Sequence, residues 1–252
     1  MHNAEQTAYD EQKNNKIMKK ILFTTAIICL LFAGCDKEDE LNIIDNGNGP
    51  LLEFIIESTG DSTKFEYDNQ RRITKISMYR NHVLYSSQTL TYSGNVLVKI
   101  VTDDSSIVEF VRKGTTVKDK EGTMVIHLNN DGTIAEFKQI WSDDHSQTVV
   151  PKYSNGNIIN LATADDYTFA ESRHDNKKSF FHHCQTPKWY LMIISEYLYG
   201  NKNNVIFFNH FWGVTKEYEY EYNDDGFSTK SVETRQRMGE VQRGIITRYE
   251  YR

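Results

Sequence analysis

The stretch that predicts the fold is Tyr67-Asp68-Asn69-Gln70-Arg71-Arg72-Ile73-Thr74-Lys75-Ile76. It reads as the end of one β-strand, a polar turn and the start of the next strand. Asn, Asp and Gly tolerate positive φ and bond their own backbone, so they reverse a chain between paired strands. The stretch therefore predicts a β-hairpin.

The same frame recurs along the chain: an anchor residue, a short run of turn-forming residues, an apolar residue and a second one a few places later. Its anchors are Tyr67, Tyr92, Leu128, Tyr153, Tyr199 and Tyr222. Their uneven spacing argues against a solenoid and favours a meander with loops of different length. Because each hairpin has two strands, six copies predict about 12 strands, a number at which a sheet usually curls or closes.

The residues before each turn alternate in character. Glu217-Tyr218-Glu219-Tyr220-Glu221-Tyr222 places three Tyr on one face and three Glu on the other, which is the period of a strand. One-sided alternation is typical of antiparallel sheets with one solvated face. The sequence thus predicts an all-β fold, an antiparallel meander that forms a curved sheet or a barrel-like structure; the pattern leaves open whether the sheet closes.

One segment departs from this alternation. Residues 187–198 begin with Pro187 and continue with a mostly apolar run. Pro is favoured at the start of a helix, although an apolar run of this length also fits a buried strand. We expect a short helical insertion here that covers one end of the sheet.

The N-terminal region reads as an export signal. Met18-Lys19-Lys20 is a short basic start, and the apolar run that follows ends in Phe32-Ala33-Gly34-Cys35. The run is too short to span a bilayer and has the length of a signal-peptide core. Small residues before a Cys resemble a bacterial lipobox, so Cys35 is the expected site of lipid attachment. The alternative is an ordinary cleaved signal with a chance Cys, and we expect translation to start at Met18 rather than Met1.

These features divide the chain into three parts. Residues 1–34 are upstream residues and signal, residues 35–50 are the lipidated Cys with a tether rich in Asn and Gly, and residues 51–252 are one hairpin-repeat domain. The acidic run Asp36-Lys37-Glu38-Asp39-Glu40 resembles the signal that exports lipoproteins to the outer face of the outer membrane. Asp directly after the Cys also resembles an inner-membrane retention signal, so the periplasmic face is the alternative.

Taken together, the chain resembles the Bacteroidota surface lipoproteins of unknown function that carry Tyr-Asp hairpin repeats. Two further segments support the resemblance, namely Asp175-Asn176-Lys177-Lys178-Ser179-Phe180-Phe181 and Asn203-Asn204-Val205. Ser179 and Phe180 stand where that family usually has Asn and Pro. The resemblance implies a porin-like fold, meaning a curved or barrel-like antiparallel sheet, and no activity. Similar repeats also occur in the shells of large polymorphic toxins.

Composition restricts the partners. The formal net charge of -6, with Lys and Arg spread singly among acidic residues, argues against a nucleic-acid partner. Once the signal is removed and Cys35 carries lipid, only Cys184 remains, so no internal disulfide is expected. No cofactor is expected, and the expected membrane contact is the lipid on Cys35.

Several residues have the types used in metal or catalytic sites. His182-His183-Cys184, with His174 and His210, is the most metal-like group, but it lacks the spacings of a structural zinc site. Asp143-Asp144-His145 with Ser142 or Ser146 has the residue types of a hydrolase, although neighbours in sequence do not form a triad. Without a nucleophile motif, we expect neither a metal site nor an enzyme.

Aromatic residues are the remaining candidates for ligand contact. Large aromatic side chains on a sheet are usually core residues, and they also stack on ligands. The candidate ligand contacts are Trp141, Phe180, Phe181, Trp189 and Trp212. The leading hypothesis is a lipid-anchored surface module that binds a glycan or a protein. The alternatives are a carrier of a lipid-like ligand in an apolar cavity and, last, a hydrolase.

Overall fold

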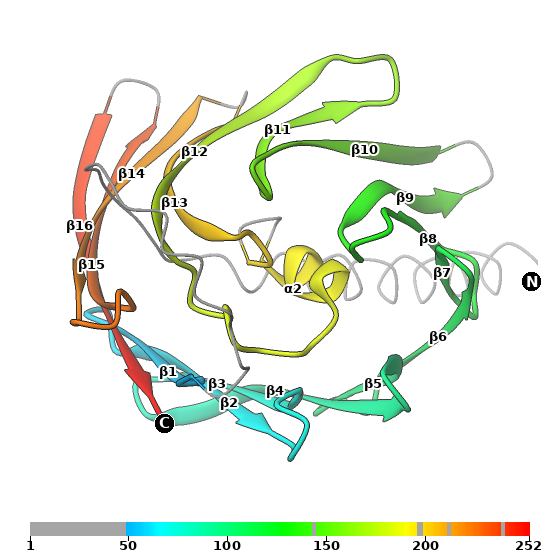
Figure 1. Cartoon of the computed structure of the whole chain (residues 1–252), viewed down its shortest axis with the longest axis horizontal. Helices are drawn as coiled ribbons and strands as arrows, with labels where there is room; N and C mark the ends of the chain where they lie inside the picture. The colour runs from blue at the N-terminus through cyan, green and yellow to red at the C-terminus, as the bar shows by residue number, and fades with distance from the viewer. Residues whose placement is uncertain (1–48, 143–144, 196–198, 211–212, 238–239) are drawn as a thin grey trace, which may run out of the picture.

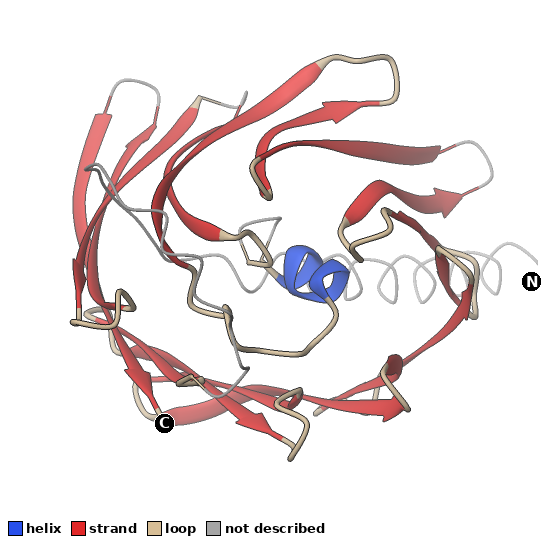
Figure 2. Cartoon of the chain, in the orientation of Figure 1, coloured by secondary structure: helices blue, strands red, loops and turns tan. Residues whose placement is uncertain are grey.

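The structure is a computed structural model that describes residues 49–142, 145–195, 199–210, 213–237 and 240–252. It is a closed antiparallel barrel of sixteen strands around one short helix (Figures 1 and 2). The elements are β1 (Leu52–Glu57), β2 (Asp61–Tyr67), β3 (Ile73–Arg80), β4 (Val83–Ser93), β5 (Val96–Thr102), β6 (Ile107–Lys113), β7 (Thr116–Asp119), β8 (Met124–Leu128), β9 (Ile134–Ser142), β10 (His145–Ser154), β11 (Asn157–Thr163), β12 (Thr168–Lys178), α2 (Lys188–Ile194), β13 (Asn203–His210), β14 (Val214–Tyr222), β15 (Ser228–Arg237) and β16 (Glu240–Tyr251).

The first and last strands close the barrel. β1 pairs with β16 in antiparallel register, with Ile55 opposite Tyr249 and Glu57 opposite Thr247. Every other strand pairs with its neighbours in the sequence. A closed sheet has no edge strand, so no row of backbone groups is left open to pairing with another chain.

The two ends of the barrel differ. At one end, which we call the plug rim, Leu51 and Arg252 exchange backbone hydrogen bonds of 3.1 and 3.0 Å, and the long connection 179–202 leaves β12. We call this connection the plug, because its described residues, 179–195 and 199–202, turn into the lumen and carry α2 to its centre (Figure 1). The opposite end, the free rim, is formed by hairpin connections that include residues 58–60, 81–82 and 103–106.

The strand count exceeds the predicted number of about 12. Five of the six predicted hairpins are turns of the plug rim, and the sixth frame, at Tyr199, is the end of the plug rather than the end of a strand. The missed hairpin joins β6 to β7 through Gly114 and has no Tyr anchor. The count also left out β1 and β16, because it took two strands for each hairpin and neither strand belongs to a predicted hairpin.

Three turns of the plug rim share one geometry. In each of them a backbone N–H donates to the carbonyl of the residue four places later, at 2.8 to 2.9 Å: Asp68 to Arg72, Asn129 to Thr133 and Asn223 to Phe227. The fourth residue of these turns has positive φ, and it is Gly132 or Gly226 in two of them. Glycine adopts this conformation without the steric cost that a side chain brings.

The anchor tyrosines connect one repeat to the previous one. Tyr92 Oη donates to the Ile73 carbonyl and Tyr153 Oη to the Ile134 carbonyl, both at 2.8 Å. Ile73 and Ile134 are the first residues of β3 and β9, which follow the preceding turns. The repeat therefore has a structural basis at these two anchors, because each of the two hydroxyls binds the strand that the previous hairpin started.

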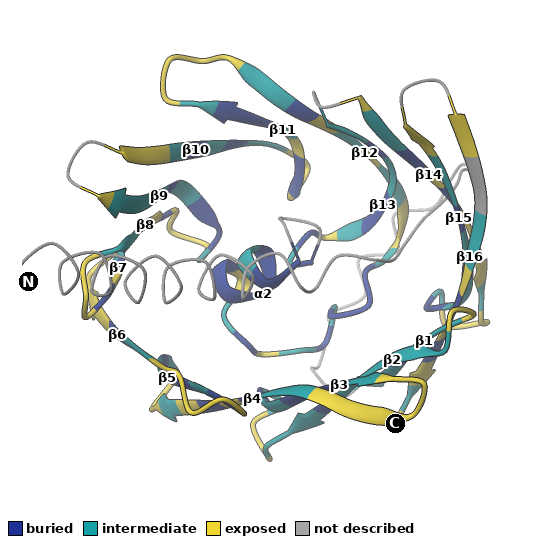
Figure 3. Ribbon diagram, turned by 180° about the vertical axis from the view of Figure 1, so that it is seen from behind, coloured by how far each residue is buried: buried dark blue, intermediate teal, exposed yellow. Residues whose placement is uncertain are grey.

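The hydrophobic core is the interior of the barrel. Inward residues such as Ile73, Leu97, Ile126 and Tyr218 are at most 1% exposed, and the hairpin ends carry most of the exposed surface (Figure 3). The predicted helix is present, but α2 lies inside the lumen instead of covering one end of the sheet. Among the described residues, no helix has the length and apolar character needed to cross a membrane.

The anchor hydroxyls provide a test of the repeat. Replacing Tyr92 or Tyr153 by Phe keeps the ring and removes one partly buried hydrogen bond, so each change should lower the free energy of unfolding by about 1 kcal/mol. The double variant should lose about 2 kcal/mol if the two sites act independently. Urea denaturation measures these values.

Tyr85→Phe is the matched control, because Tyr85 is 41% exposed. Its stability should stay within about 0.5 kcal/mol of the parent protein. Equal losses in all three single variants would show that the anchor hydroxyls have no special role.

Candidate functional site: the barrel lumen

The plug leaves the wall where β12 ends and returns to it where β13 begins, and we call this junction the neck of the plug. It is held by Asp175 of β12 and Asn204 of β13. The Asn204 backbone N–H donates to Asp175 Oδ1 at 3.0 Å, and Asn204 Nδ2 donates to Asp175 Oδ2 at 3.2 Å. Tyr222 Oη, from β14, also donates to Asp175 Oδ2. Burial raises the pKa of the Asp175 carboxyl, which these hydrogen bonds partly offset.

The neighbouring hairpin binds the other side of the neck. Asn157 and Asn203 bond reciprocally: Asn157 Nδ2 donates to Asn203 Oδ1 and the Asn203 N–H donates to Asn157 Oδ1, both at 2.9 Å. The Ile158 N–H donates to Asn201 Oδ1 at 2.8 Å. The two segments that the sequence singled out, 175–181 and 203–205, are thus joined by hydrogen bonds where the plug enters the lumen.

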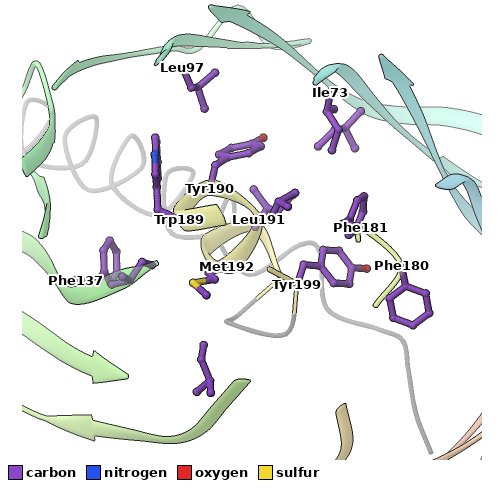
Figure 4. Packing of buried hydrophobic residues seen from close by; sticks show 14 of the residues in the cluster. Ile73, Leu97, Phe137, Phe180, Phe181, Trp189, Tyr190, Leu191, Met192 and Tyr199 are labelled. Carbon is purple, nitrogen blue, oxygen red and sulfur yellow. The ribbon is translucent and has the colours of Figure 1, made fainter. Parts of the chain in front are cut away.

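The plug fills its part of the lumen with aromatic and aliphatic side chains (Figure 4). Trp189 packs edge-on against Phe110 of β6 at a centroid distance of 5.2 Å, and Phe181 does the same against Phe65 of β2 at 5.1 Å. Phe180 lies 4.6 Å from Tyr249 of β16. A carrier of a lipid-like ligand would need this space, which the protein's own side chains occupy.

Polar contacts fix the plug against the opposite wall. Thr186 Oγ1 accepts the Ile73 N–H at 2.7 Å, and Tyr190 Oη donates to Gln88 Oε1 at 2.9 Å. Arg71 Nε donates to the His183 carbonyl at 3.2 Å. Turns and strands that lie far from the plug in the sequence therefore satisfy its buried polar groups, as burial requires.

The predicted ligand contacts do not form one exposed platform. Phe180, Phe181 and Trp189 are buried in the plug, at 3% to 6% exposure. Trp141 lies on β9, with its indole Nε1 buried and without a hydrogen-bond partner. Trp212 and the predicted lipid site Cys35 lie outside the described residues. Contact of these aromatic residues with a ligand stays a prediction.

The predicted metal-like residues are distributed between plug and wall. His182, His183 and Cys184 lie in the plug, whereas His174 and His210 lie on β12 and β13. Within the part of the chain that the structure describes, no three potential metal ligands converge. Burial raises the pKa of the Cys184 thiol to about 11, which keeps it protonated and weakly nucleophilic at neutral pH.

The hydrolase-like residues lie at the free rim. Ser142 Oγ and His145 Nδ1 are 3.3 Å apart across the end of the β9–β10 hairpin, and both residues are exposed. Asp143 and Asp144 lie outside the described residues. Among the described residues nothing orients the His145 ring as the third group of a triad does.

A second feature of the lumen lies towards the free rim, where four charged side chains lie on the inner wall. We call this group, Glu57, Lys216, Glu233 and Arg235, the charged layer. Arg235 Nε donates to Glu233 Oε1 at 2.9 Å. Glu233 and Lys216 are 2% and 6% exposed. Burial raises the pKa of the Glu57 carboxyl to about 7, and the nearby carboxylates of Asp61 and Glu233 act in the same direction.

Strand registers place the charged layer on β14, β15 and β1, with β16 lying between β15 and β1. Lys216 of β14 lies opposite Arg235 of β15, and Tyr218 lies opposite Glu233. Glu57 of β1 lies opposite Thr247 of β16. The sequence analysis missed this layer, although a signal was present. Lys216 shares the phase of Tyr218, Tyr220 and Tyr222, which marks it as inward-facing.

Comparisons with known proteins support the fold. No protein-family model matches the sequence, and no curated protein matches it either. A porin-like protein from Bacteroides uniformis has a similar solved structure, with a TM-score of 0.50 and 14% identity over 80% of this chain and 95% of that one. At this identity the likeness concerns the fold alone.

Weaker likenesses involve much larger proteins. The Tc holotoxin pore of Photorhabdus luminescens and a TcdB2-TccC3-TEV structure each give a TM-score of 0.25, at 11% and 10% identity. In each case 73% of this chain is matched, which corresponds to 11% of the other chain. These two values are too low to support an argument.

Removal of the Asp175 carboxylate should loosen the neck of the plug. In Asp175→Ala the buried groups of Asn204 and Tyr222 lose their acceptor, so the free energy of unfolding should fall by about 2 to 4 kcal/mol. Limited proteolysis should then cut within residues 179–202. Asp225→Ala, at an exposed turn of the same rim, should leave both readouts unchanged; equal effects would contradict the role of the neck.

Ionisation of Glu57 should make stability depend on pH. Its folded-state pKa of about 7 lies above the ordinary glutamate value of 4.5, so the folded state keeps a proton that the unfolded chain loses. Stability therefore falls as pH rises from 4.5 to 7. Glu57→Gln should remove about 1 kcal/mol of this loss. This is less than the full pKa shift would give, because Glu57 is partly exposed and solvent screens its charge.

Burial lowers the pKa of His174 to about 4, so His174 makes stability rise with pH, which is opposite to the effect of Glu57. Because His174 is present in both proteins, the difference between Glu57→Gln and the parent protein reports on Glu57. Thermal unfolding at pH 5 and pH 8 measures the difference. Glu53→Gln, on the same strand, is the control and should keep the parent's pH dependence. A Glu57→Gln variant with that same dependence would show that Glu57 titrates normally.

Proposed function

We propose that the protein is a non-catalytic binding barrel that a lipid on Cys35 holds at the outer face of the outer membrane. The observation that carries the proposal is that the chain enters the barrel at the plug rim. The Gly49 carbonyl accepts a hydrogen bond from Arg71 Nη2, and Leu51 pairs with Arg252 at the plug rim. A tether attached here would turn the plug rim towards the membrane and the free rim away from it.

The polarity of the wall supports a barrel that stands outside the bilayer. Barrels that span membranes are apolar on the outside and polar inside. Here Glu217, Glu219 and Glu221 of β14 point outwards and are exposed, while Tyr218 of the same strand points inwards and is buried. This arrangement suits water on the outside and a packed core within.

The chemistry of the candidate nucleophiles supports the absence of catalysis. The Cys184 thiol has a raised pKa, and Ser142 has no oriented base among the described residues. An activated nucleophile needs a lowered pKa or an adjacent base that a third group orients. The proposal therefore assigns binding rather than catalysis to the free rim and the lumen behind it.

Replacement of the lipidated Cys provides the test. Cys35→Ser should move the protein from the membrane fraction to the soluble fraction, because lipid chains supply the membrane affinity. Cys184→Ser is the matched control and should stay with the membrane. A membrane-bound Cys35→Ser variant would contradict anchoring through this residue.

Orientation is tested separately in intact cells. Protease added outside should digest the parent protein, starting from the free rim. Protection that disappears when the outer membrane is opened would contradict surface exposure and assign the barrel to the periplasmic face.

A further inference from the structure

Arg71 occupies a backbone position that two related turns give to glycine. It is the fourth residue of the turn between β2 and β3 and has a φ of 65°, whereas the corresponding residues of the two other turns are Gly132 and Gly226, with φ of 82° and 78°. A side chain carries a steric cost in this left-handed conformation, which glycine avoids. Such strain persists where the surrounding structure holds the residue in place, so the contacts of Arg71 need an explanation beyond the turn itself.

Arg71 and its strand hold the plug. Arg71 Nε donates to the His183 carbonyl at 3.2 Å, and the Gln185 N–H donates to the Arg71 carbonyl at 2.9 Å. Two residues later the Ile73 N–H donates to Thr186 Oγ1 at 2.7 Å. The turn and the first residue of β3 thus bind three residues of the plug just ahead of α2.

The same guanidinium group reaches the chain where it enters the barrel. Arg71 Nη2 donates to the Gly49 carbonyl, so one side chain joins the end of the tether to the plug. Gly49 also lies directly on the His183 ring, and a Cβ at this position would overlap that ring. The ring has little room to move, because His183 is 6% exposed and packs on the Phe227 ring at a centroid distance of 5.4 Å. We call Gly49, Arg71 and His183 the clip.

The barrel wall begins just after the clip. Leu51 exchanges two backbone hydrogen bonds with Arg252, and the Leu52 carbonyl accepts from Tyr67 Oη at 2.6 Å. Gly49 lies ahead of this paired segment, where the clip holds it. The tether can therefore be drawn off the plug as far as Leu51 without breaking the pairing that closes the barrel.

We propose that the end of the tether is a strap that holds the plug in the lumen. While Gly49 lies on His183, Arg71 is bonded to both, and the plug residues ahead of α2 stay bound to the turn. When the tether is drawn away from the plug rim, the clip opens and these residues are released, while β1 and β16 stay paired. Because the plug fills its part of the lumen, the strap controls access to that space.

This device goes beyond the binding barrel proposed above. It concerns contacts within the folded chain and does not depend on lipid at Cys35. Fractionation of Cys35→Ser and the test of the clip can therefore fail separately.

The test is amide hydrogen exchange of residues 182–186 in the purified full chain, measured by mass spectrometry. In this segment the Cys184 and Gln185 N–H groups donate to the carbonyls of Phe181 and Arg71. Arg71→Gly removes the clip and suits the backbone of the turn. It should speed this exchange about tenfold or more through local opening. The unfolding temperature should stay within about 3 °C of the parent's, because relief of strain offsets the lost contacts.

Gly49→Ala opens the clip from the side of the tether and should speed the same exchange about tenfold. Gly114→Ala is the matched control. It strains a plug-rim turn with a φ of 61°, but nothing lies within 4 Å of the added Cβ. Its exchange at residues 182–186 should stay within about twofold of the parent's, because the opening of the plug is local.

The double variant Arg71→Gly/Gly49→Ala tests whether the two residues act as one unit. If they do, it should exchange no faster than the faster single variant, because the clip can be lost once. An increase equal to the product of the two single increases overturns the proposal. Parent-like exchange in Gly49→Ala also overturns it, as does an increase that Gly114→Ala matches, since that would reflect a general loss of stability.

Discussion

The width of a sixteen-stranded barrel is the constraint on which the rest of this structure depends. About eight strands enclose a lumen that inward side chains can fill, and sixteen leave an open channel. Water in that channel would remove the apolar burial that stabilises the fold. The plug solves this problem by bringing Trp189, Tyr190, Leu191 and Met192 to the barrel axis. The neck at Asp175 and Asn204 follows from the same need, because a long connection must be held where it enters.

The closure itself depends on many small, repeated contacts. Tyr92 and Tyr153 bind carbonyls of strands that lie 19 residues earlier in the chain, so neighbouring hairpins are linked at one rim. Each such bond contributes about 1 kcal/mol, but their repetition aligns one hairpin after another in register. The irregular spacing of the anchors has two sources: the β6–β7 hairpin between Tyr92 and Leu128 carries no anchor, and most of the plug lies between Tyr153 and Tyr199.

The two halves of the lumen differ in chemistry. Around α2 the interior is apolar and packed, whereas towards the free rim the inner wall carries Glu57, Lys216, Glu233 and Arg235. The first half accounts for stability and follows the usual rule for cores. The second half departs from that rule, and departures of this kind tend to mark places where function takes precedence over stability.

The sequence by itself determined the antiparallel fold, the turns of the plug rim and the helix after Pro187, because local turn chemistry and the two-residue period are properties of neighbouring residues. It also identified 175–181 and 203–205, but not their contact, which joins strands separated by the plug. The number of strands was underestimated where a hairpin, at Gly114, lacks an aromatic anchor. Only the tertiary structure decided that the sheet closes, that α2 lies in the lumen, and that Trp189, Phe180 and Phe181 are core. These outcomes depend on the pairing of β1 with β16 and on the volume that the closed barrel encloses. Both depend on residues far apart in the chain, so no short stretch of sequence predicts them.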